Sequence, residues 1–508
     1  MTPLADTVRA LVDAQVAARP DAVYAVDADG RQTLRYIDLA AATADVAALL
    51  RAQGSVPGDI VSLVMSNGLQ TLRLLIGAMA GGWCVNPVNL LSQRDAMRYV
   101  IAHSDCRVVI TSPEWADTVH AIVATLERPV GVVVSAADAP ALPLPPAADR
   151  TAPPAPAPDA LALLMYTSGT TGVPKGVMLT QANLAANALA IVAEHGLAAE
   201  DRVLAVLPLY HINAFAVTML APLASGGSLL MPPRFSAARF WAQAQEGGCT
   251  WINVVPTMIA YLLESADPPP GATARIRFCR SASAALPPEH LRAFERRFGI
   301  GVVETMGLTE TVAPAFSNPM DPGQRKLGSV GRASGCEARI VDAALQPLPD
   351  EQAGQTGEIV IRGPNVMRGY YKNDEATRAS FTPDGWLRTG DLGHRDADGF
   401  FFVTGRIKEL IIKGGENIAP REIDEALLAH PAVLDAAAVG IPDPRYGQDI
   451  MVCVVRREGV PCSEDELRDH CLRTLGRFKT PRVIRFVPEL PRGPSGKVQR
   501  LKLLDLPA

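Results

Sequence analysis

The sequence predicts an α/β protein with a large N-terminal domain, made of layered α/β subdomains plus a β-rich subdomain, and a small α+β C-terminal domain. Helical runs rich in alanine and leucine alternate with short apolar strands over residues 1–135, and the alternation resumes over 159–335. Such alternation is typical of parallel sheets covered by helices. From residue 336 the strands become shorter and are punctuated by glycine, which predicts a β-rich subdomain.

The elements of the N-terminal part follow one another in a regular order. A helical run at residues 36–54 is followed by predicted strands at 59–65, 106–111 and 131–135. Residues 137–158 are rich in proline and alanine, which predicts an exposed connection. Further strands, each followed by a helix-like stretch, are predicted at 162–168, 202–208, 250–256 and 276–283. One large α/β body follows from this order.

The remainder of the chain predicts two smaller units. Strands of the β-rich subdomain are expected at 337–342, 357–364 and 399–405. Beyond Lys408, a smaller α+β pattern predicts helices and strands at 420–430, 433–441, 449–458, 463–475 and 481–487. The change of pattern places the domain boundary at Arg406–Lys408, which gives an N-terminal domain of residues 1–406 and a C-terminal domain of 407–508.

Composition and charge exclude several classes of protein. Hydrophobic residues make up 48% and charged residues 20% of the chain, which is typical of a globular protein. The formal net charge of −5 argues against a nucleic-acid partner, because neutralising phosphates needs a basic surface. The two most apolar regions, 72–91 and 203–233, are interrupted by glycine, proline and polar residues, so we expect no integral membrane association.

The cysteines and the N-terminus predict a cytoplasmic protein. The eight cysteines include no C-x-x-C pair, which disfavours both a zinc site and a disulfide framework. Residues 1–20 carry Asp6, Arg9 and Asp13 where a signal peptide needs an uninterrupted apolar segment. The sequence leaves the oligomeric state open, with a homodimer as one alternative.

The stretch "YTSGTTGVPKGV" at residues 166–177 is the most informative single motif. Its glycines allow backbone N–H groups to point into one concavity, its hydroxyls add donors, and Lys175 adds a cation, so the stretch suits a phosphate chain. The spacing differs from the G-x-x-x-x-G-K-[ST] of P-loop enzymes. Taken alone, the stretch fits a flexible surface turn equally well.

Other segments decide between these two interpretations. In chain order, six segments resemble the motifs of the adenylate-forming superfamily, which includes acyl-CoA synthetases, nonribosomal adenylation domains and firefly-type luciferases. They are "YTSGTTGVPKGV" (166–177), "LPLYH" (207–211), "ETMGLTE" (304–310), "DGWLRTGD" (384–391), "GRIKELIIKGGENIAPREIDEAL" (405–427) and "PRGPSGKVQR" (491–500). The resemblance is to the carboxylic acid–CoA ligase branch. It implies a reaction in which a carboxylate and ATP give an acyl-adenylate and pyrophosphate, after which a thiol displaces AMP.

The resemblance also implies an ATP site. It predicts that the triphosphate is surrounded by Thr167, Ser168, Gly169, Thr170, Thr171 and Lys175. It places the adenine beside Ser283, Ala284, Ala285, Glu304, Thr305 and Met306, and the ribose and phosphates at Asp391 and Arg406. Met306 stands where the family usually has an aromatic residue, so a thioether replaces the flat stacking partner. A turn-capping role for Asp391 and an interdomain salt bridge for Arg406 are the alternatives.

Four further residues are implied in catalysis. Glu310 resembles the carboxylate that binds Mg²⁺, Thr309 the contact to the α-phosphate, and His211 a feature of CoA ligases rather than amino-acid-activating domains. Lys497 resembles the adenylation lysine, whose ammonium bridges the carboxylate and the α-phosphate. Lys408 occupies the position of the hinge about which the mobile C-terminal domain is expected to rotate. A surface glutamate or lysine is the alternative for Glu310 and Lys497.

The thiol and acyl sites complete the prediction. Coenzyme A is expected at Gly414, Gly415, Tyr446, Phe478 and Lys479, although a core position is an alternative for the two aromatic residues. The acyl pocket is predicted at Asn213, Ala214, Val217, Ser281, Thr305 and Ala313, which suits a small or polar carboxylic acid. The alternatives are a medium-chain or aryl acid, an enzyme that loads a carrier protein, and a non-catalytic binding protein.

Overall fold

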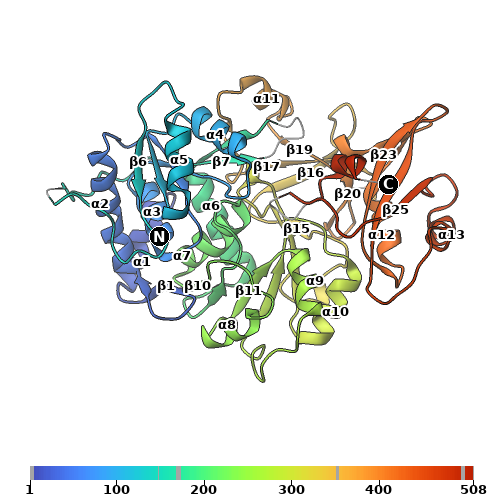
Figure 1. Ribbon diagram of the computed structural model, residues 1–508, viewed down its shortest axis with the longest axis horizontal. Helices are drawn as coiled ribbons and strands as arrows, with labels where there is room; N and C mark the ends of the chain where they lie inside the picture. The colour runs from blue at the N-terminus through green and yellow to red at the C-terminus, as the bar shows by residue number, and fades with distance from the viewer. Residues whose placement is uncertain (1–4, 147, 168–172, 350–353, 494–497, 507–508) are drawn as a thin grey trace.

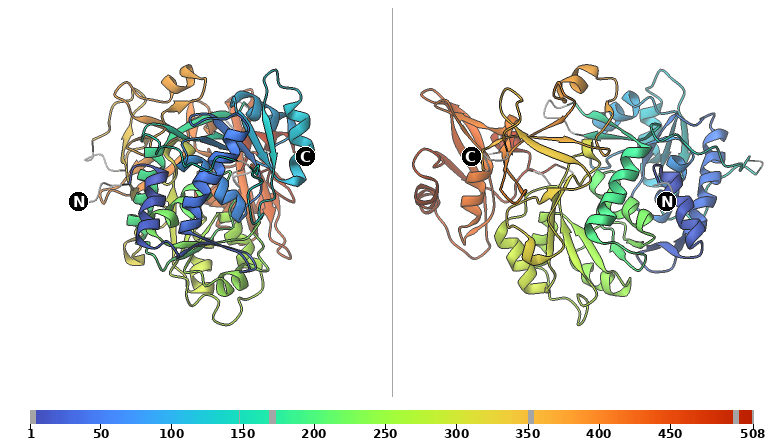
Figure 2. Two further views of the ribbon diagram at one scale, coloured as in Figure 1. Left: turned by 90° about the vertical axis from the view of Figure 1, so that its left-hand side faces the viewer. Right: turned by 180° about the vertical axis from the view of Figure 1, so that it is seen from behind.

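The computed structural model describes residues 5–146, 148–167, 173–349, 354–493 and 498–506. Within these residues the strands form four sheets, and Figure 1 shows them arranged along the length of the molecule. Two large sheets with helices form the body, a four-stranded sheet adjoins it, and a five-stranded sheet lies at the C-terminal end. Figure 2 shows this last part projecting at one end of the molecule.

The first large sheet is seven-stranded, with the order β18-β8-β7-β4-β3-β5-β6. Its central strands are parallel, whereas β7 with β8 and β8 with β18 are antiparallel. Their bounds are Ile60–Val64 (β3), Cys84–Pro87 (β4), Val108–Thr111 (β5), Gly131–Val134 (β6), Leu161–Thr167 (β7), Lys175–Thr180 (β8) and Gly369–Tyr370 (β18). β3, β4 and β5 are buried along their whole length, which explains their continuous apolar character.

The second large sheet is nine-stranded, with the order β15-β14-β13-β12-β11-β9-β10-β1-β2. Its six central strands are parallel, from β13 to β1, and its edges are antiparallel. The bounds are Val23–Asp27 (β1), Thr33–Arg35 (β2), Arg202–Leu204 (β9), Ser228–Met231 (β10), Trp251–Val254 (β11), Phe278–Ser281 (β12), Val302–Met306 (β13), Phe316–Ser317 (β14) and Arg332–Ala333 (β15).

Helices fill the space between the two large sheets and cover their outer faces. The central layer holds the largest apolar core and consists of α1 (Val8–Ala18), α2 (Tyr36–Ala52), α3 (Leu69–Ala80), α6 (Gln181–His195), the π-helix η2 (Asn213–Leu220) and α7 (Ala221–Ser225). The outer layers are α4 (Arg94–His103) and α5 (Ala116–Val123) on one sheet, and α8 (Phe240–Glu246), α9 (Pro256–Glu264) and α10 (Pro288–Phe298) on the other. The body is therefore a stack of five layers.

Local sequence explains where these elements begin and end. At the start of α6, the Thr180 hydroxyl accepts a hydrogen bond from the Asn183 backbone N–H, and the Asn183 side chain accepts one from the Thr180 N–H. This capping box satisfies two backbone donors of the first turn. The helix ends at Gly196, which is left-handed with φ 53° and therefore suits glycine.

The β-rich subdomain and the C-terminal part follow. An antiparallel sheet in the order β16-β17-β19-β20 contains Glu337–Val341, Gly357–Arg362, Leu387–Arg395 and Phe401–Arg406, and the helix α11 (Asp374–Ala379) follows β18. The C-terminal sheet contains β21 (Ile411–Lys413), β22 (Glu416–Ile418), β23 (Val433–Asp443), β24 (Gly447–Arg456) and β25 (Val483–Phe486), which pack with α12 (Pro420–Leu428) and α13 (Glu464–Leu475).

Short 3₁₀ turns complete the chain. They are η1 (Pro113–Trp115), η3 (Thr309–Thr311), η4 (Pro322–Gln324), η6 (Ile407–Glu409) and η7 (Arg500–Asp505). β20 ends at Arg406 and η6 follows directly, so the chain passes from the four-stranded sheet to the C-terminal sheet at the predicted boundary residues. Among the described residues, no helix has the length and apolar character needed to cross a membrane.

Candidate active site

Tyr370 connects two of the charged residues that the motifs predict in one site. β7 ends at Thr167 opposite Lys175, the first residue of β8, and β18 pairs with the other edge of β8. The Lys175 ammonium lies 5.0 Å from the centroid of the Tyr370 ring. The Tyr370 hydroxyl donates a 2.8 Å hydrogen bond to Oε1 of Glu310. A lysine and a carboxylate from distant motifs therefore contact the same aromatic side chain.

The loop between β7 and β8 includes Ser168, Gly169, Thr170 and Thr171, which lie outside the described residues. Their predicted contacts with the triphosphate stay predictions. Glu310 lies in η3 beside Thr309, and its backbone carbonyl accepts a hydrogen bond of 2.8 Å from the Met367 N–H. Burial, and then the negative charge of Glu310, raise the pKa of the Tyr370 phenol, which therefore stays protonated and donates to the carboxylate.

An ion pair joins the buried Asp391, the predicted ribose contact, to the partly exposed Arg406, two residues before the predicted hinge. Asp391 on β19 and Arg406 on β20 are register partners, and Arg406 Nε lies 2.7 Å from Asp391 Oδ1. Burial lowers the pKa of Arg406, but the carboxylates of Asp391, Glu409 and Glu310 more than offset this, and the net change is upward. Arg406 is therefore a permanent cation in the field of Glu310 as well as Asp391.

The segment predicted to hold adenine follows β12. Ser283 has a left-handed backbone with φ 76°, and its hydroxyl accepts a 3.2 Å hydrogen bond from the Asn213 side-chain amide. Ala284 and Ala285 continue this loop. Glu304 and Met306 lie on the neighbouring strand β13. Burial raises the pKa of Glu304 to about 7, although Arg421 opposes the shift, so this carboxyl is partly protonated near neutral pH.

The carboxyl ends of three parallel strands carry polar residues on one face of the nine-stranded sheet. β11, β12 and β13 are neighbours, with Asn253 in register with Arg280 and Arg280 in register with Val303. Trp251, Phe278 and Val303 belong to the central apolar core. Because side chains alternate along a strand, the residues two positions later face the same way. These are Asn253, Arg280 and Thr305, all buried.

Arg280 is the unexpected member of this group. Its side chain is completely buried, and Nη1 donates hydrogen bonds of 2.6 Å to Asn213 Oδ1 and 2.8 Å to Asn253 Oδ1. Nε and Nη2 have no hydrogen-bond partner among the described residues. Burial lowers the pKa of Arg280 to about 9, so the guanidinium stays charged at neutral pH. A charged residue inside the apolar predicted strand 276–283 is the sequence signal that could have drawn attention to it.

Among the residues predicted to line the acyl pocket, Asn213 contacts Arg280 directly. Asn213, Ala214 and Val217 all lie on the π-helix, and all three are buried. Ala313 packs in the same core as Val303 and Val217. Ser281 Oγ and Thr305 Oγ1 are buried without a hydrogen-bond partner among the described residues. π-helical turns are rare and occur mostly at functional sites, and periodicity alone did not predict this one.

His211, which the motifs predict in catalysis, lies two residues before the π-helix η2. The His211 ring lies 4.8 Å from that of Tyr210, and its backbone carbonyl accepts a 3.0 Å hydrogen bond from the Phe215 N–H at the start of η2. Lys497 lies outside the described residues. The chain on either side of it is tied to the C-terminal sheet, because Arg492 pairs with Asp435 of β23 and Arg500 donates a 2.9 Å hydrogen bond to the Ala438 carbonyl of the same strand.

Lys408 lies in η6, next to Glu409, whose carboxylate accepts a 3.1 Å hydrogen bond from Arg500 Nε. The residue predicted as the hinge is thus adjacent to the contact that fixes the chain after Lys497. Its role as a hinge stays a prediction.

An aromatic pair marks the predicted coenzyme A face. Gly414 and Gly415 form the turn between β21 and β22, with φ 57° and 86°, which suits glycine. The Gly414 N–H donates a 2.8 Å hydrogen bond to the Tyr446 carbonyl, and the rings of Tyr446 and Phe478 are 46% and 37% exposed. They are therefore surface rings and not core residues. Lys479 is held by Glu422, with both carboxylate oxygens 2.7 Å away.

Lys413 adds a cation beneath these rings that the motifs did not predict. Its ammonium pairs with Asp449 at 2.6 Å and lies 5.7 Å from the Tyr446 ring and 5.3 Å from the Phe478 ring. The two residues are both nearly buried, so their ion pair is protected from solvent.

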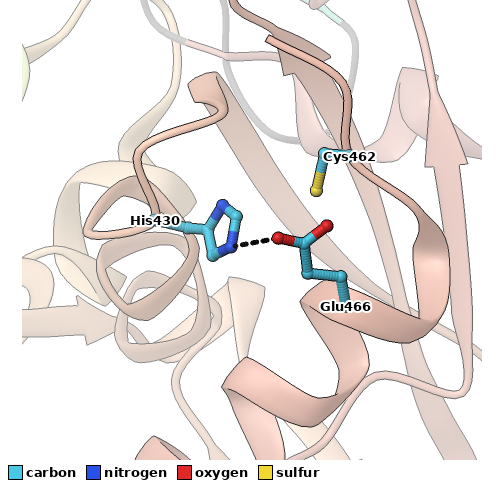
Figure 3. A group of neighbouring side chains, drawn as sticks. All are labelled: His430, Cys462 and Glu466. Carbon is cyan, nitrogen blue, oxygen red and sulfur yellow. Dashed lines mark ion pairs between the residues drawn. The ribbon is translucent and has the colours of Figure 1, made fainter.

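His430, Cys462 and Glu466 form a separate group with metal-ligand chemistry, drawn in Figure 3. His430 Nδ1 accepts a 3.3 Å hydrogen bond from the Ala432 N–H, and Nε2 lies 3.5 Å from Glu466 Oε1. Burial raises the pKa of the Cys462 thiol, so it is not a thiolate at neutral pH. These contacts tie the end of α12 to the start of α13, which is a sufficient structural role. All eight cysteines are free thiols.

The fold and these side chains define an adenylate-forming enzyme. The family model described as AMP-binding enzyme matches residues 12–371, and that of the AMP-binding enzyme C-terminal domain matches 422–497. The chain therefore belongs to the AMP-binding enzyme family, in the acyl-CoA synthetase branch that its motifs resemble.

Particular relatives narrow the comparison. A protein of Cupriavidus necator named sulfoacetate–CoA ligase is 59% identical over 502 residues, which cover 98% of each chain. An oxalate–CoA ligase of Arabidopsis thaliana is 35% identical over 461 residues, with 88% of each chain covered. The crystal structure of ATP-bound MatB from Rhodopseudomonas palustris is similar with a TM-score of 0.90 and 31% identity, covering 98% of each chain. This likeness confirms the predicted fold class.

Proposed function

We propose that the enzyme is an ATP-dependent CoA ligase that activates a small carboxylic acid carrying a second anionic group, with sulfoacetate as the first candidate. The observation that carries the proposal is the 59% identity, across 98% of both chains, with the relative named sulfoacetate–CoA ligase. The buried polar group around Arg280 supports it, because a pocket for a fatty or unsubstituted aryl acid has no use for a buried cation.

The first half-reaction needs charge neutralisation and positioning more than a protein nucleophile. Lys175 and Glu310 are proposed to meet the triphosphate, and their shared contact with Tyr370 supports this. The donor set fits Mg²⁺, because Tyr370 uses Oε1 of Glu310 and no described residue bonds Oε2, which remains available to a hard cation. When bound, Mg²⁺ neutralises phosphate charge. Thr309 adjoins Glu310 and is proposed to contact the α-phosphate.

The nucleoside end is proposed to lie between Asp391 and the loop after β12. Asp391 offers acceptors to the ribose hydroxyls, while Arg406 holds this carboxylate in place and adds positive charge. Lys497 would supply the ammonium that brings the substrate carboxylate and the α-phosphate together.

In the second half-reaction, the C-terminal domain is proposed to turn about Lys408 and present Gly414 and Gly415 to the thiol arm of coenzyme A. The exposed rings of Tyr446 and Phe478 offer faces on which the CoA adenine can stack. Lys479 is engaged by Glu422, so a role for it toward phosphate requires that this exposed ion pair opens.

The purified enzyme should be incubated with ATP, Mg²⁺ and CoA and with each of sulfoacetate, oxalate, malonate, hexanoate and benzoate. We expect AMP and an acyl-CoA thioester, detected by mass spectrometry, with the highest kcat/KM for sulfoacetate. Acyl-adenylate without thioester would indicate a carrier protein as acceptor. Preferred activation of hexanoate or benzoate would refute the proposed substrate class.

A further inference from the structure

Arg280 is a buried cation without a counter-charge. No carboxylate of the described residues lies within ion-pair distance of its guanidinium. His195 is a titratable neighbour of Arg280. Burial, and then the charges of Arg280 and Arg277, lower the pKa of this imidazole to about 3, so it is neutral. A buried charge is costly unless it is paired, and the buried cation Lys413 follows that rule, since it pairs with Asp449.

The hydrogen bonds of Arg280 leave one edge of the guanidinium unused. Nη1 is occupied by Asn213 and Asn253, whereas Nε and Nη2 have no partner among the described residues. Nε–H and Nη2–H are parallel and together form the edge that binds an oxyanion through two hydrogen bonds. Arg388 in the same chain uses this edge on Glu358, at 3.0 and 2.8 Å. The vacant edge of Arg280 therefore has the geometry of a carboxylate or sulfonate receptor.

The position of Arg280 is that of a ligand site. In parallel sheets, ligands bind at the carboxyl ends of the strands, and Arg280 lies one residue before the end of β12. Asn213 connects it to the nucleotide region, because the same side chain accepts from Arg280 and donates to Ser283. Thr305, on the same face of the next strand, also has an unpartnered hydroxyl. A buried cation and an unpartnered hydroxyl therefore lie on neighbouring strands, one hydrogen-bonded residue away from the predicted adenine loop.

We propose that Arg280 binds the distal anionic group of the acid substrate through its Nε and Nη2 edge, and so selects acids with two negative charges. Asn213 and Asn253 are positioning residues that hold the guanidinium through Nη1. This role of Arg280 rests on the proposed function, because it requires a substrate with a second anionic group. It concerns a sulfonate or carboxylate equally, since both offer two coplanar oxygens to the same edge.

The test compares acids that differ in the charge of the group distal to the reacting carboxylate. Sulfoacetate and methylsulfonylacetate, in which an uncharged sulfone of similar size replaces the sulfonate, are assayed with the wild type, Arg280→Met and Arg280→Lys, and malonate and its monomethyl ester form a second pair. Arg297→Met is the control, because this guanidinium is bonded to backbone carbonyls and Asp267 at the far end of α10. Calorimetric titration of the AMP-bound enzyme with sulfoacetate gives a readout that does not depend on turnover.

For Arg280→Met we expect kcat/KM for sulfoacetate to fall about 100-fold or more, because a buried charge pair is lost. The kcat/KM of Arg280→Met for methylsulfonylacetate should stay close to that of the wild type or rise. In the calorimetric titration of this variant, the heat of sulfoacetate binding should be lost. For Arg280→Lys, kcat/KM for sulfoacetate should fall by about 10-fold, because a lysine keeps the charge without the two-point contact. Comparison of the wild-type kcat/KM values for sulfoacetate and malonate shows whether Arg280 prefers a sulfonate or a carboxylate.

Two outcomes separate the inference from the proposed function. If the wild type makes thioesters but does not distinguish sulfoacetate from methylsulfonylacetate, or if Arg280→Met keeps the preference, Arg280 is not the receptor. If the wild type makes no thioester from any acid tested, the proposed function itself is wrong. Should Arg280→Met not fold, the wild-type comparison of the two analogue pairs and Arg280→Lys still decide the matter.

Discussion

Lys413 is buried with its ammonium 2.6 Å from Asp449, and Asp391 is buried against Arg406 at 2.7 Å. In both pairs the opposite charge compensates for the loss of water, and removing one partner would leave an uncompensated charge. Glu304 avoids the cost of a buried charge in a different way. Its pKa is raised to about 7 mainly by burial, so near neutral pH it holds a proton instead of relying on a full ion pair.

This protonation makes stability depend on pH in a predictable direction. The pKa of Glu304 rises from 4.5 to about 7 on folding, so between these values the folded state binds a proton that the unfolded state has released. Stability therefore falls as pH rises through this window, by up to about 1.4 kcal/mol per pH unit. Glu304→Gln removes this dependence, and we expect it to be more stable than the wild type at about pH 8.

Thermal unfolding from about pH 5 to pH 8 checks this prediction. Glu289→Gln is the control, because Glu289 lies on the exposed side of α10 and its carboxylate is 59% accessible. If the unfolding temperatures of the wild type and Glu304→Gln run parallel over the whole range, the carboxyl of Glu304 is ionised throughout and the prediction is wrong.

The length and composition of each strand or helix decide whether it can be predicted from the sequence. The strands predicted at 59–65, 106–111 and 276–283 were found as β3, β5 and β12, and β3 and β5 are mainly apolar because they are buried on both faces. β18 was missed because it has only two residues, and with it the contact of Tyr370 with Lys175 and Glu310. A long-range pairing of two residues leaves no local pattern.

The π-helix η2 and the group around Arg280 show the same limit. A fully buried apolar run does not distinguish helix types by periodicity, so residues 203–233 indicated only buried core. The motifs drew attention to Asn213, but its partners Arg280 and Asn253 lie on strands that are far away in the sequence. Tertiary structure brings these side chains together, and only the charge of Arg280 within an apolar strand hinted at it.

The β21–β22 turn and the aromatic pair beside it lead to a prediction at the scale of elements. Tyr446 is half exposed and contributes little to the core, so Tyr446→Ala should fold with almost unchanged stability. If the ring stacks on the CoA adenine, its loss should raise the KM for CoA about 10-fold. The rate of acyl-adenylate formation, measured by ATP–pyrophosphate exchange, should be unaffected.

Tyr261→Ala is the matched control, because Tyr261 is a similarly exposed ring on α9, away from the C-terminal sheet. An unchanged KM for CoA in Tyr446→Ala, with the same value in the control, would place the CoA adenine elsewhere on the enzyme.

For the whole molecule, the question is how two half-reactions use one nucleotide site. The C-terminal domain carries both the segment with Lys497 and the turn with Gly414 and Gly415, which suggests that the same small domain serves each half-reaction with a different surface. The ion pair of Arg500 with Asp424 and its bond to Glu409 fix the chain after Lys497 to this domain and to η6. If the C-terminal domain moves about Lys408 as proposed, we expect the chain from Val498 onward to move with it, because these bonds hold it.

This coupling predicts that Lys497→Ala separates the half-reactions. Loss of the ammonium that offsets repulsion between the acid and the α-phosphate should reduce acyl-adenylate formation about 100-fold or more, measured by ATP–pyrophosphate exchange. Thioester formation from supplied acyl-adenylate and CoA should stay close to the wild-type rate, because that step uses the other surface of the domain. Lys502→Ala is the control, since Lys502 is an exposed lysine five residues further along, in η7. Equal losses in both half-reactions would mean that Lys497 supports the fold of the domain, and the two-surface model would be rejected.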